Sequence, residues 1–238
     1  MMEADGVLLI DKPTGCTSHD VVDYVRNRFH FKKVGHCGTL DPLATGLLML
    51  VIGKATKIQD LLMAEDKEYA GTMKLGAVTD SQDADGKITE EKPVPELSAE
   101  QIDTAFKKYT GDFYQMPPMV SALKQGGVPL YKLARAGKTV EREPRLVRIN
   151  SYILEEVALP LIKFRIQCSK GFYVRTYCHD IGQDLGCGAH LVQLSRLKSG
   201  NFSLERALSW ETLQKIGDAS QLLPSLLTLP EVSRLRRQ

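Results

Sequence analysis

Hydrophobic residues along the chain follow several short patterns, and each of them predicts a strand. The apolar runs at 7–10 and 47–52 have the length that is typical of buried strands. Residues 69–75 alternate between apolar and polar positions, as the residues of a half-buried strand do. Two further segments, 146–158 and 161–168, are rich in β-forming residues and predict a pair of adjacent strands.

Helices are predicted where apolar residues recur at intervals of three or four. One is expected to begin at Ser18, which can act as its cap, and Val21, Val22, Val25 and Phe29 then share one face. Further helices are predicted over 54–63, 98–109, 129–135 and 172–185, with a short one after Ser209. Because strands and helices are mixed without a regular βαβ rhythm, we expect an α+β fold.

Two segments are predicted to lack regular structure. Residues 79–97 are acidic and contain Gly86, Pro93 and Pro95, which is typical of an exposed loop. The last residues of the chain end in several arginines and are expected to be loosely held.

Composition indicates a globular chain with room for one large domain or two modest ones. Its 238 residues are 43% hydrophobic, which is enough for a packed core. No apolar stretch reaches twenty residues and the N-terminus lacks the pattern of a secretory signal, so neither a membrane span nor secretion is expected. Five cysteines without a Cys-x-x-Cys pair indicate free thiols in a reducing cytoplasm.

Charge is unevenly spread along the chain, although the net charge is only +2. Residues 80–103 carry mostly acids, whereas 124–148 and 26–36 carry mostly bases. Segregated basic segments suit a polyanion that contacts one face of a protein, such as a nucleic acid. Each segment taken alone is also consistent with an ordinary solvated surface.

A glycine-rich loop at 35–46 holds a single carboxylate. Asp41 is the only acid between Asp23 and Asp60, and a predicted core strand follows the loop directly. The glycines permit backbone angles that other residues avoid, while Pro42 fixes its own φ and favours an extended conformation at Asp41. A lone acid is therefore held at the mouth of a core strand, although an Asp-Pro pair also starts ordinary turns.

Four motifs of this chain occur in an order that resembles one known family. The loop reads Gly35-His36-Cys37-Gly38-Thr39-Leu40-Asp41-Pro42-Leu43-Ala44-Thr45-Gly46, and the other motifs are Asp11–Ser18, Lys67–Tyr69 and Ser169–Thr176, with Gly186–Leu191 following the last. Together they resemble the TruB family of tRNA pseudouridine synthases over about residues 5–210. The resemblance implies a mixed, mainly antiparallel central sheet flanked by helices.

The resemblance also implies a division of the chain. Residues 1–210 are expected to form the catalytic domain, and residues 211–238 a C-terminal extension. Many relatives carry a small RNA-binding domain of the PUA type after the catalytic part, and the chain is expected to lack one.

The family reaction isomerises uridine 55 in the T arm of tRNA to pseudouridine and needs no cofactor. It breaks the bond between C1′ and N1, turns the base and joins C1′ to C5. By resemblance Asp41 is the nucleophile, and Arg175 is the partner that keeps it ionised and oriented. Tyr69 is implied to stack on the flipped uracil and to help remove the C5 proton. Without the family, Arg175 is as consistent with a surface residue and Tyr69 with a core residue.

Four more residues are implied to bind the substrate. His36 is expected to insert where the target base was, Tyr173 to lie at the substrate, and Leu194 to pack against the uracil. Lys12 is expected to buttress the catalytic loop and to contact phosphate. The implied partner is the T stem-loop of tRNA, bound by a monomer without a metal and recognised through its shape.

Other chemistries and functions stay open from the sequence alone. Cys37 beside His36 could be a thiol nucleophile, and Cys187 and His190 with Cys178 and His179 have a spacing compatible with zinc. The chain could instead be chiefly a folding helper that binds tRNA. It could also modify a different RNA, such as ribosomal RNA within a guide-RNA complex.

Overall fold

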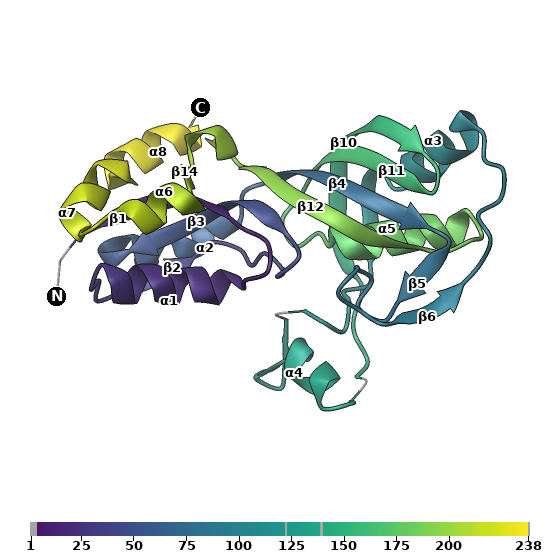
Figure 1. Cartoon of the computed structure of the whole chain (residues 1–238), viewed down its shortest axis with the longest axis horizontal. Coiled ribbons are helices and arrows are strands. Elements are labelled where there is room, and N and C mark those ends of the chain that lie inside the picture. Colours follow the sequence, from purple (N-terminus) through teal and green to yellow (C-terminus); the bar gives the residue numbers. More distant parts are fainter. Residues whose placement is uncertain (1–3, 122, 139, 238) are drawn as a thin grey trace. The chain divides into compact units, whose positions relative to one another are not determined.

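The computed structural model describes residues 4–121, 123–138 and 140–237 and divides into two compact units. The first unit runs to Tyr69 and resumes at Ser195, and the second unit is Ala70–Leu194. Strands of both units belong to a mixed sheet that is accompanied by helices (Figure 1), so the predicted α+β class is confirmed. No helix in the described residues is long and apolar enough to cross a membrane.

The first unit is built on two long antiparallel strands, β1 and β3. Its elements are β1 (Gly6–Lys12), α1 (Ser18–Arg28), β2 (Val34–His36), β3 (Thr45–Ile52), η1 (Gly53–Ile58), α2 (Gln59–Met63), β13 (Phe202–Ser203), η2 (Leu204–Arg206), β14 (Leu208–Ser209), α6 (Trp210–Lys215), α7 (Ala219–Leu222), η3 (Leu223–Ser225), β15 (Leu226–Leu227) and α8 (Leu229–Arg237). Strand β12 (Ala189–Ser199) enters it from the second unit. The helix predicted over 54–63 is thus a 3-10 turn followed by a short α-helix.

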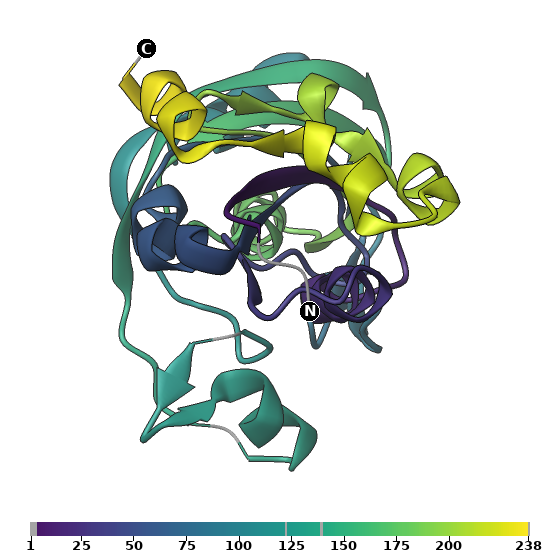
Figure 2. The same cartoon turned by 90° about the vertical axis from the view of Figure 1, so that its left-hand side faces the viewer.

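The register of β1 against β3 places alternate side chains on two buried faces. The pairs run from Gly6 opposite Ile52 to Lys12 opposite Gly46. Val7 and Leu9 face a cluster that includes residues of α2 and α8, and Figures 1 and 2 show α1 on the other side of these strands. Because both faces are covered, the strand sequences are continuously apolar, as the pattern indicated.

Residues 211–237 belong to the first unit and are not loosely held. β15 pairs antiparallel with β1, and Val232 of α8 is only 1% exposed. Arg236 donates from Nε to Oε1 of Glu65 at 2.6 Å. The loose C-terminus expected from the arginine-rich ending is therefore wrong, because the apolar side of α8 packs against the core and its basic side faces outward.

The second unit places two helices on an antiparallel sheet. Its elements are β4 (Lys67–Leu75, which begins in the first unit), β5 (Ala77–Thr79), β6 (Ile88–Glu91), α3 (Ala99–Lys107), β7 (Gly111–Gln115), β8 (Lys124–Gln125), β9 (Val128–Pro129), α4 (Leu130–Arg135), β10 (Arg145–Ala158), β11 (Leu161–Cys168) and α5 (Val174–Asp184). The strand order here is β12-β4-β11-β10-β7. The predicted pairing of the segments 146–158 and 161–168 is confirmed.

An aromatic cluster fixes α3 and α5 on this sheet. Tyr177 of α5 lies edge-on to Phe106 of α3, with ring centroids 5.6 Å apart, and to Phe164 of β11 at 6.0 Å. Edge-to-face rings add about 1 kcal/mol per pair beyond the area they bury. The helix that begins just before Arg175 is therefore held rigidly.

The predicted exposed acidic loop at 79–97 contains regular and buried structure. β5 and β6 form a short antiparallel ladder, and Asp83 between them is only 4% exposed. Backbone hydrogen bonds join Ala84 N–H to the Leu191 carbonyl and Leu191 N–H to the Gln82 carbonyl. Because these bonds tie the turn to β12, Asp83 is drawn inside, and the prediction that this acidic stretch is solvated is wrong there.

Asp180 in α5 makes stability depend on pH. Burial raises the pKa of its carboxyl to about 6, the nearby charge of Asp184 adds to the increase, and Lys108 opposes it. Between about pH 4 and pH 6 the folded state keeps a proton that the unfolded state releases, so the free energy of unfolding falls as pH rises through this window.

We expect Asp180→Asn to increase the free energy of unfolding by about 1 kcal/mol above pH 6, a value reduced because the carboxyl is partly exposed to solvent. The gain should shrink towards pH 4, where the carboxyl of the folded wild-type protein is neutral. Urea unfolding at several pH values measures the difference. A gain that is the same at every pH would contradict the assignment.

Candidate active site

The loop with Asp41 lies in the first unit between β2 and β3. Gly38 and Gly46 near its ends have φ of +91° and +96°, angles that other residues rarely adopt. Ala44 N–H donates to the Asp41 carbonyl at 3.0 Å and closes a turn around Pro42. The sequence left two interpretations of Asp41, an ordinary Asp-Pro turn and an acid held at the mouth of a core strand. Both are correct, because the turn is what holds the acid.

A second segment, residues 14–18, holds this loop from the side. Gly15 N–H donates to the Pro42 carbonyl at 2.8 Å, and Thr14 Oγ1 donates to the Leu43 carbonyl at 3.2 Å. Ser18 Oγ accepts from Leu40 N–H at 2.8 Å and donates to the Leu40 carbonyl at 3.1 Å. Leu40 before Asp41, and Pro42 and Leu43 after it, are therefore fixed by partners more than twenty positions away in sequence.

Ser18 does not cap the first helix, contrary to the sequence prediction. The cap is Thr17, whose side chain accepts from Asp20 N–H while the Asp20 carboxylate accepts from Thr17 N–H. The neighbouring Thr17 supplies the reciprocal capping box. This leaves the Ser18 hydroxyl available for the loop.

Lys12 lies at the base of the same segment and is fully buried. Its Nζ donates to the carbonyls of Pro13 and Cys16, at 2.8 and 2.7 Å. Burial lowers the pKa of Lys12, whereas the charge of Asp41 is among the causes that raise it. The geometry supports the expected buttress role. Contact with phosphate stays a prediction, and burial of the ammonium disfavours it.

His36 ends β2, just before the loop, and is partly buried. Burial lowers the pKa of its ring, and the charges of Arg196 and His19 lower it further, while a backbone hydrogen bond with Gly38 opposes them. Its Nδ1 is buried without a hydrogen-bond partner among the described residues. A neutral imidazole is consistent with stacking on bases, and its insertion into RNA stays a prediction.

Tyr69 and Leu194 lie where β4 and β12 pass between the units. Each is 9% exposed, and Tyr69 follows the buried Lys67 and Glu68. Asp41, His36, Lys12 and Tyr69 thus belong to the first unit, and Arg175, Tyr173 and Leu194 to the second. The expected pairing of Asp41 with Arg175 stays a prediction.

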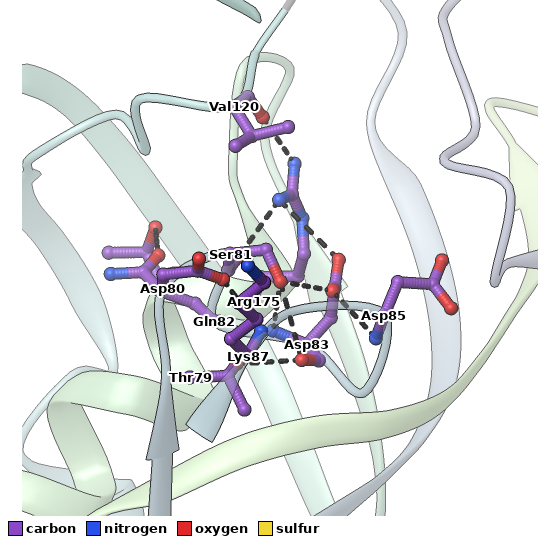
Figure 3. A network of polar contacts seen from close by, with 10 residues as sticks. Thr79, Asp80, Ser81, Gln82, Asp83, Asp85, Lys87, Val120 and Arg175 are labelled. Carbon is purple, nitrogen blue, oxygen red and sulfur yellow. Dashed lines mark hydrogen bonds and ion pairs between the residues drawn. The ribbon is translucent and has the colours of Figure 1, made fainter. Parts of the chain in front are cut away.

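Arg175 is a buried side chain of the second unit, 3% exposed. Figure 3 shows its guanidinium between two segments: Nη1 donates to the Ser81 carbonyl at 2.9 Å and Nη2 to the Val120 carbonyl at 2.7 Å. Its Nη1 also lies 3.5 Å from Oδ2 of Asp83. A planar guanidinium can satisfy several acceptors at once, so its orientation is fixed.

Asp83 was missed by the sequence analysis. Its Oδ1 accepts from Ser81 Oγ at 2.5 Å and from Asp85 N–H at 3.2 Å, which aims Oδ2 at Arg175 (Figure 3). Gln82 beside it has a φ of +66°, unusual for a residue other than glycine. The available signal was the run of small and polar residues around it, which suits a tight, internally hydrogen-bonded turn.

Tyr173 caps the helix that carries Arg175. Its backbone is held on both sides by Gln115, whose Nε2 donates to the Tyr173 carbonyl at 3.0 Å and whose Oε1 accepts from Tyr173 N–H at 2.8 Å. Gln115 is 2% exposed. The amide thus fixes the start of α5 and, with it, the direction in which Arg175 leaves the helix.

The alternative nucleophile Cys37 is unsuited to that role. The thiol is fully buried, and burial raises its pKa to about 12, so it is neutral at physiological pH. We expect a thiol reagent at pH 8 to label Cys16 in the folded protein and the four buried cysteines only after unfolding. Mass spectrometry of the labelled peptides checks this, and rapid labelling of Cys37 would contradict it.

The zinc alternative finds no assembled set of ligands. Cys178 is fully buried, and Nδ1 of His190 lies 2.9 Å from the Ala77 carbonyl. Within residues 4–121, 123–138 and 140–237, no three His, Cys, Asp or Glu side chains are grouped to hold a metal ion.

Family models match most of the chain. Residues 26–174 match the N-terminal domain of the TruB family pseudouridylate synthases. Residues 175–237 match the C-terminal domain of tRNA pseudouridylate synthase B.

Curated relatives agree with these models. A tRNA pseudouridine synthase B of Opitutus terrae is 53% identical over 98% of this chain and 92% of its own length. One of Geobacter sulfurreducens is 47% identical over 94% of this chain and 74% of its own. Among solved structures, a chain of a Cbf5-Nop10-Gar1 complex superposes with a TM-score of 0.74 at 26% identity, covering 97% of this chain and 62% of that chain.

Proposed function

Because the chain belongs to the TruB family of pseudouridine synthases, we propose that it isomerises uridine 55 in the T arm of tRNA, with Asp41 as nucleophile. The observation that carries the assignment of Asp41 is the way its loop is held. Hydrogen bonds from Gly15, Thr14 and Ser18 fix the residues on both sides of it. A reacting group that is already in place needs no ordering at the moment of reaction.

The isomerisation conserves atoms and electrons, so the chain's own residues can carry it. The C1′–N1 bond breaks, the C1′–C5 bond forms, C5 loses a proton, and N1 ends with one. A free aspartic acid has a pKa of about 3.9, so a carboxylate is available as nucleophile near neutral pH. The phenol of Tyr69 is the proposed group at the C5 proton, and Arg175 is the proposed cation near the carboxylate.

The target base must leave its stack to reach Asp41. Unstacking costs a few kcal/mol, and an aromatic ring that stacks on the extruded base offsets part of that cost. Tyr69 is proposed for this contact, with Leu194 against the other side of the uracil and Tyr173 beside it. His36 is proposed to fill the vacated place in the RNA.

A basic pocket on the first unit supports binding of a polyanion. Lysines 32, 33, 54 and 57 line a cavity of about 410 Å³ together with Phe31, Thr56 and Asp5, whose carboxylate pairs with Lys54. Lys33 and Lys57 are exposed. Lysines of the basic segment 26–36 thus lie beside lysines of a distant segment, and such a cluster attracts a polyanion.

We expect Lys33→Gln with Lys57→Gln to weaken tRNA binding about tenfold at physiological salt and to leave the turnover rate at saturating tRNA unchanged. The slope of log Kd against log salt should become shallower, because fewer counterions are released on binding. Filter binding over a salt series measures both quantities. An unchanged affinity and slope would exclude this pocket from the RNA interface.

The activity is tested with purified protein and unmodified tRNA transcripts. The proposal predicts one pseudouridine per transcript at position 55, none on a transcript with cytidine 55, and conversion of an isolated T stem-loop. Pseudouridine at another position, or none, would contradict the proposed site. Sedimentation of the protein alone and with tRNA tests whether it acts as the proposed monomer.

A folding helper is the competing function. If the chain acts chiefly by binding, its Asp41→Asn form should restore tRNA folding in cells that lack the wild-type protein. If catalysis is the main role, that form should fail in assays that depend on the modified base. We propose a cytoplasmic location for the catalytic role, where tRNA is the substrate, and cell fractionation checks it.

A further inference from the structure

Arg196 lies beneath the loop that carries Asp41, although no sequence motif drew attention to it. It is one of the largest fully buried side chains, 1% exposed, and belongs to β12. Within the part of the chain that the structure describes, its guanidinium forms no ion pair. A buried arginine without a carboxylate is costly, so its hydrogen bonds need an explanation.

Those hydrogen bonds join the two ends of the loop. Nε donates to the Leu47 carbonyl at 2.7 Å, and Nη2 donates to the Gly38 carbonyl at 3.2 Å. Gly38 lies three residues before Asp41, and Leu47 lies six residues after it. One rigid planar group therefore bridges the entrance and the exit of the loop.

Two glycines of the loop, Gly38 and Gly46, lie close to this arginine. A Cβ on Gly38 would lie 3.3 Å from Nη1 of Arg196. A Cβ on Gly46 would lie 2.5 Å from the backbone oxygen and 2.7 Å from the backbone nitrogen of Arg196. A side chain at Gly46 would therefore clash with the backbone of Arg196, and one at Gly38 would crowd its guanidinium. The close approach of loop and strand brings the carbonyls of Gly38 and Leu47 within reach of the guanidinium.

The charge of Arg196 influences the pKa values of three groups around the loop. Burial is the main cause of the lowered pKa values of Lys12 and His36, and the charge of Arg196 lowers both further. At Cys37 the same charge opposes the increase in pKa that burial causes. The positive charge of Arg196 therefore lies near groups of three segments.

We propose that Arg196 is a positioning residue for the isomerisation, which holds the Asp41 loop closed through the carbonyls of Gly38 and Leu47. The proposal rests on the proposed function. Arg196 would act by ordering the backbone of the loop. The proposal includes no contact between Arg196 and RNA.

The test compares Arg196→Lys and Arg196→Met with Arg236→Lys. Lysine keeps the charge but cannot span both carbonyls, and methionine removes charge and donors together. Arg236 is a matched control, since it is a partly buried arginine of the same unit that binds Glu65, remote in sequence from the loop. The readouts are kcat, KM for tRNA, the thermal midpoint, and amide hydrogen exchange.

For Arg196→Lys we expect kcat to fall roughly 10²-fold with KM within twofold, because small displacements of a reacting group cost about that much. Amide exchange should accelerate over residues 38–47 and nowhere else in the first unit. Arg196→Met should lose at least as much activity, and Arg236→Lys should behave as wild type. If Arg196→Met fails to fold, Arg196→Lys alone decides the test.

Three results would overturn the proposal: Arg196→Lys with kcat within twofold of wild type, a loss confined to KM, or a loss of activity that only follows the unfolded fraction. Wild-type turnover on unmodified tRNA is measured first. If wild type forms no pseudouridine, the proposed function fails, and the exchange experiment alone still decides whether Arg196 holds the loop.

Discussion

Replacing Asp41 with asparagine is expected to abolish pseudouridine formation while leaving tRNA binding intact. Asparagine has nearly the same size, and the loop is held through backbone groups of Leu40, Pro42 and Leu43, so its conformation should be kept. Only the nucleophilic oxygen is lost. Removal of a nucleophile from a pre-arranged site costs at least about 10⁴-fold in turnover.

Single-turnover conversion of tRNA measures this loss, and the Kd for tRNA, expected within about threefold of wild type, shows that the site still forms. Asp23→Asn is the matched control, since Asp23 lies on α1 of the same unit and pairs with Arg26 at the surface. Turnover by Asp41→Asn within tenfold of wild type would show that another group is the nucleophile.

The second large effect is expected for Asp83→Asn. Oδ1 of Asp83 accepts two hydrogen bonds, and Oδ2 faces the guanidinium of Arg175. Asparagine has one oxygen and one NH₂ group in place of the two carboxylate oxygens. In either orientation of the amide its NH₂ group faces donors, from Ser81 and Asp85 or from Arg175, so one contact becomes repulsive. Breaking one side of a buried ion pair lowers the free energy of unfolding by about 3 kcal/mol.

Turnover by Asp83→Asn should fall roughly 10²-fold, because Arg175 loses its fixed direction. The control is Asp85→Asn, an exposed acid two residues away that contacts Asp83 through its backbone N–H, a group that the substitution keeps. Unfolding in urea and turnover at saturating tRNA separate the two effects. If stability falls while the rate per folded molecule stays the same, Asp83 supports the fold and has no part in orienting Arg175.

Local chemistry explains what could be predicted from the sequence. Strands β10 and β11 follow from their β-forming residues, and the cap of α3 follows from Ser98 and Gln101, whose reciprocal hydrogen bonds are present. The loop with Asp41 follows from its glycines and Pro42, each of which restricts or frees the backbone at its own position. These features need no knowledge of distant residues.

Long-range pairing explains what could not be predicted. Asp83 is buried because Gln82 and Ala84 hydrogen-bond to Leu191, more than a hundred residues later. Arg196 is buried because its donors meet the carbonyls of Gly38 and Leu47, about 150 residues earlier. In the sequence both are charged residues of ordinary type, and charged residues are usually exposed. Only the folded arrangement reveals which of them have buried partners.

The central claim is that this chain makes pseudouridine at position 55 of tRNA through Asp41. Mapping pseudouridines in total RNA from cells without the chain, and from the same cells given back wild type or Asp41→Asn, tests it directly. The account predicts that position 55 of tRNAs loses the modification, that wild type restores it, and that Asp41→Asn does not. Unchanged modification of position 55 in cells without the chain, or its restoration by Asp41→Asn, would contradict the account.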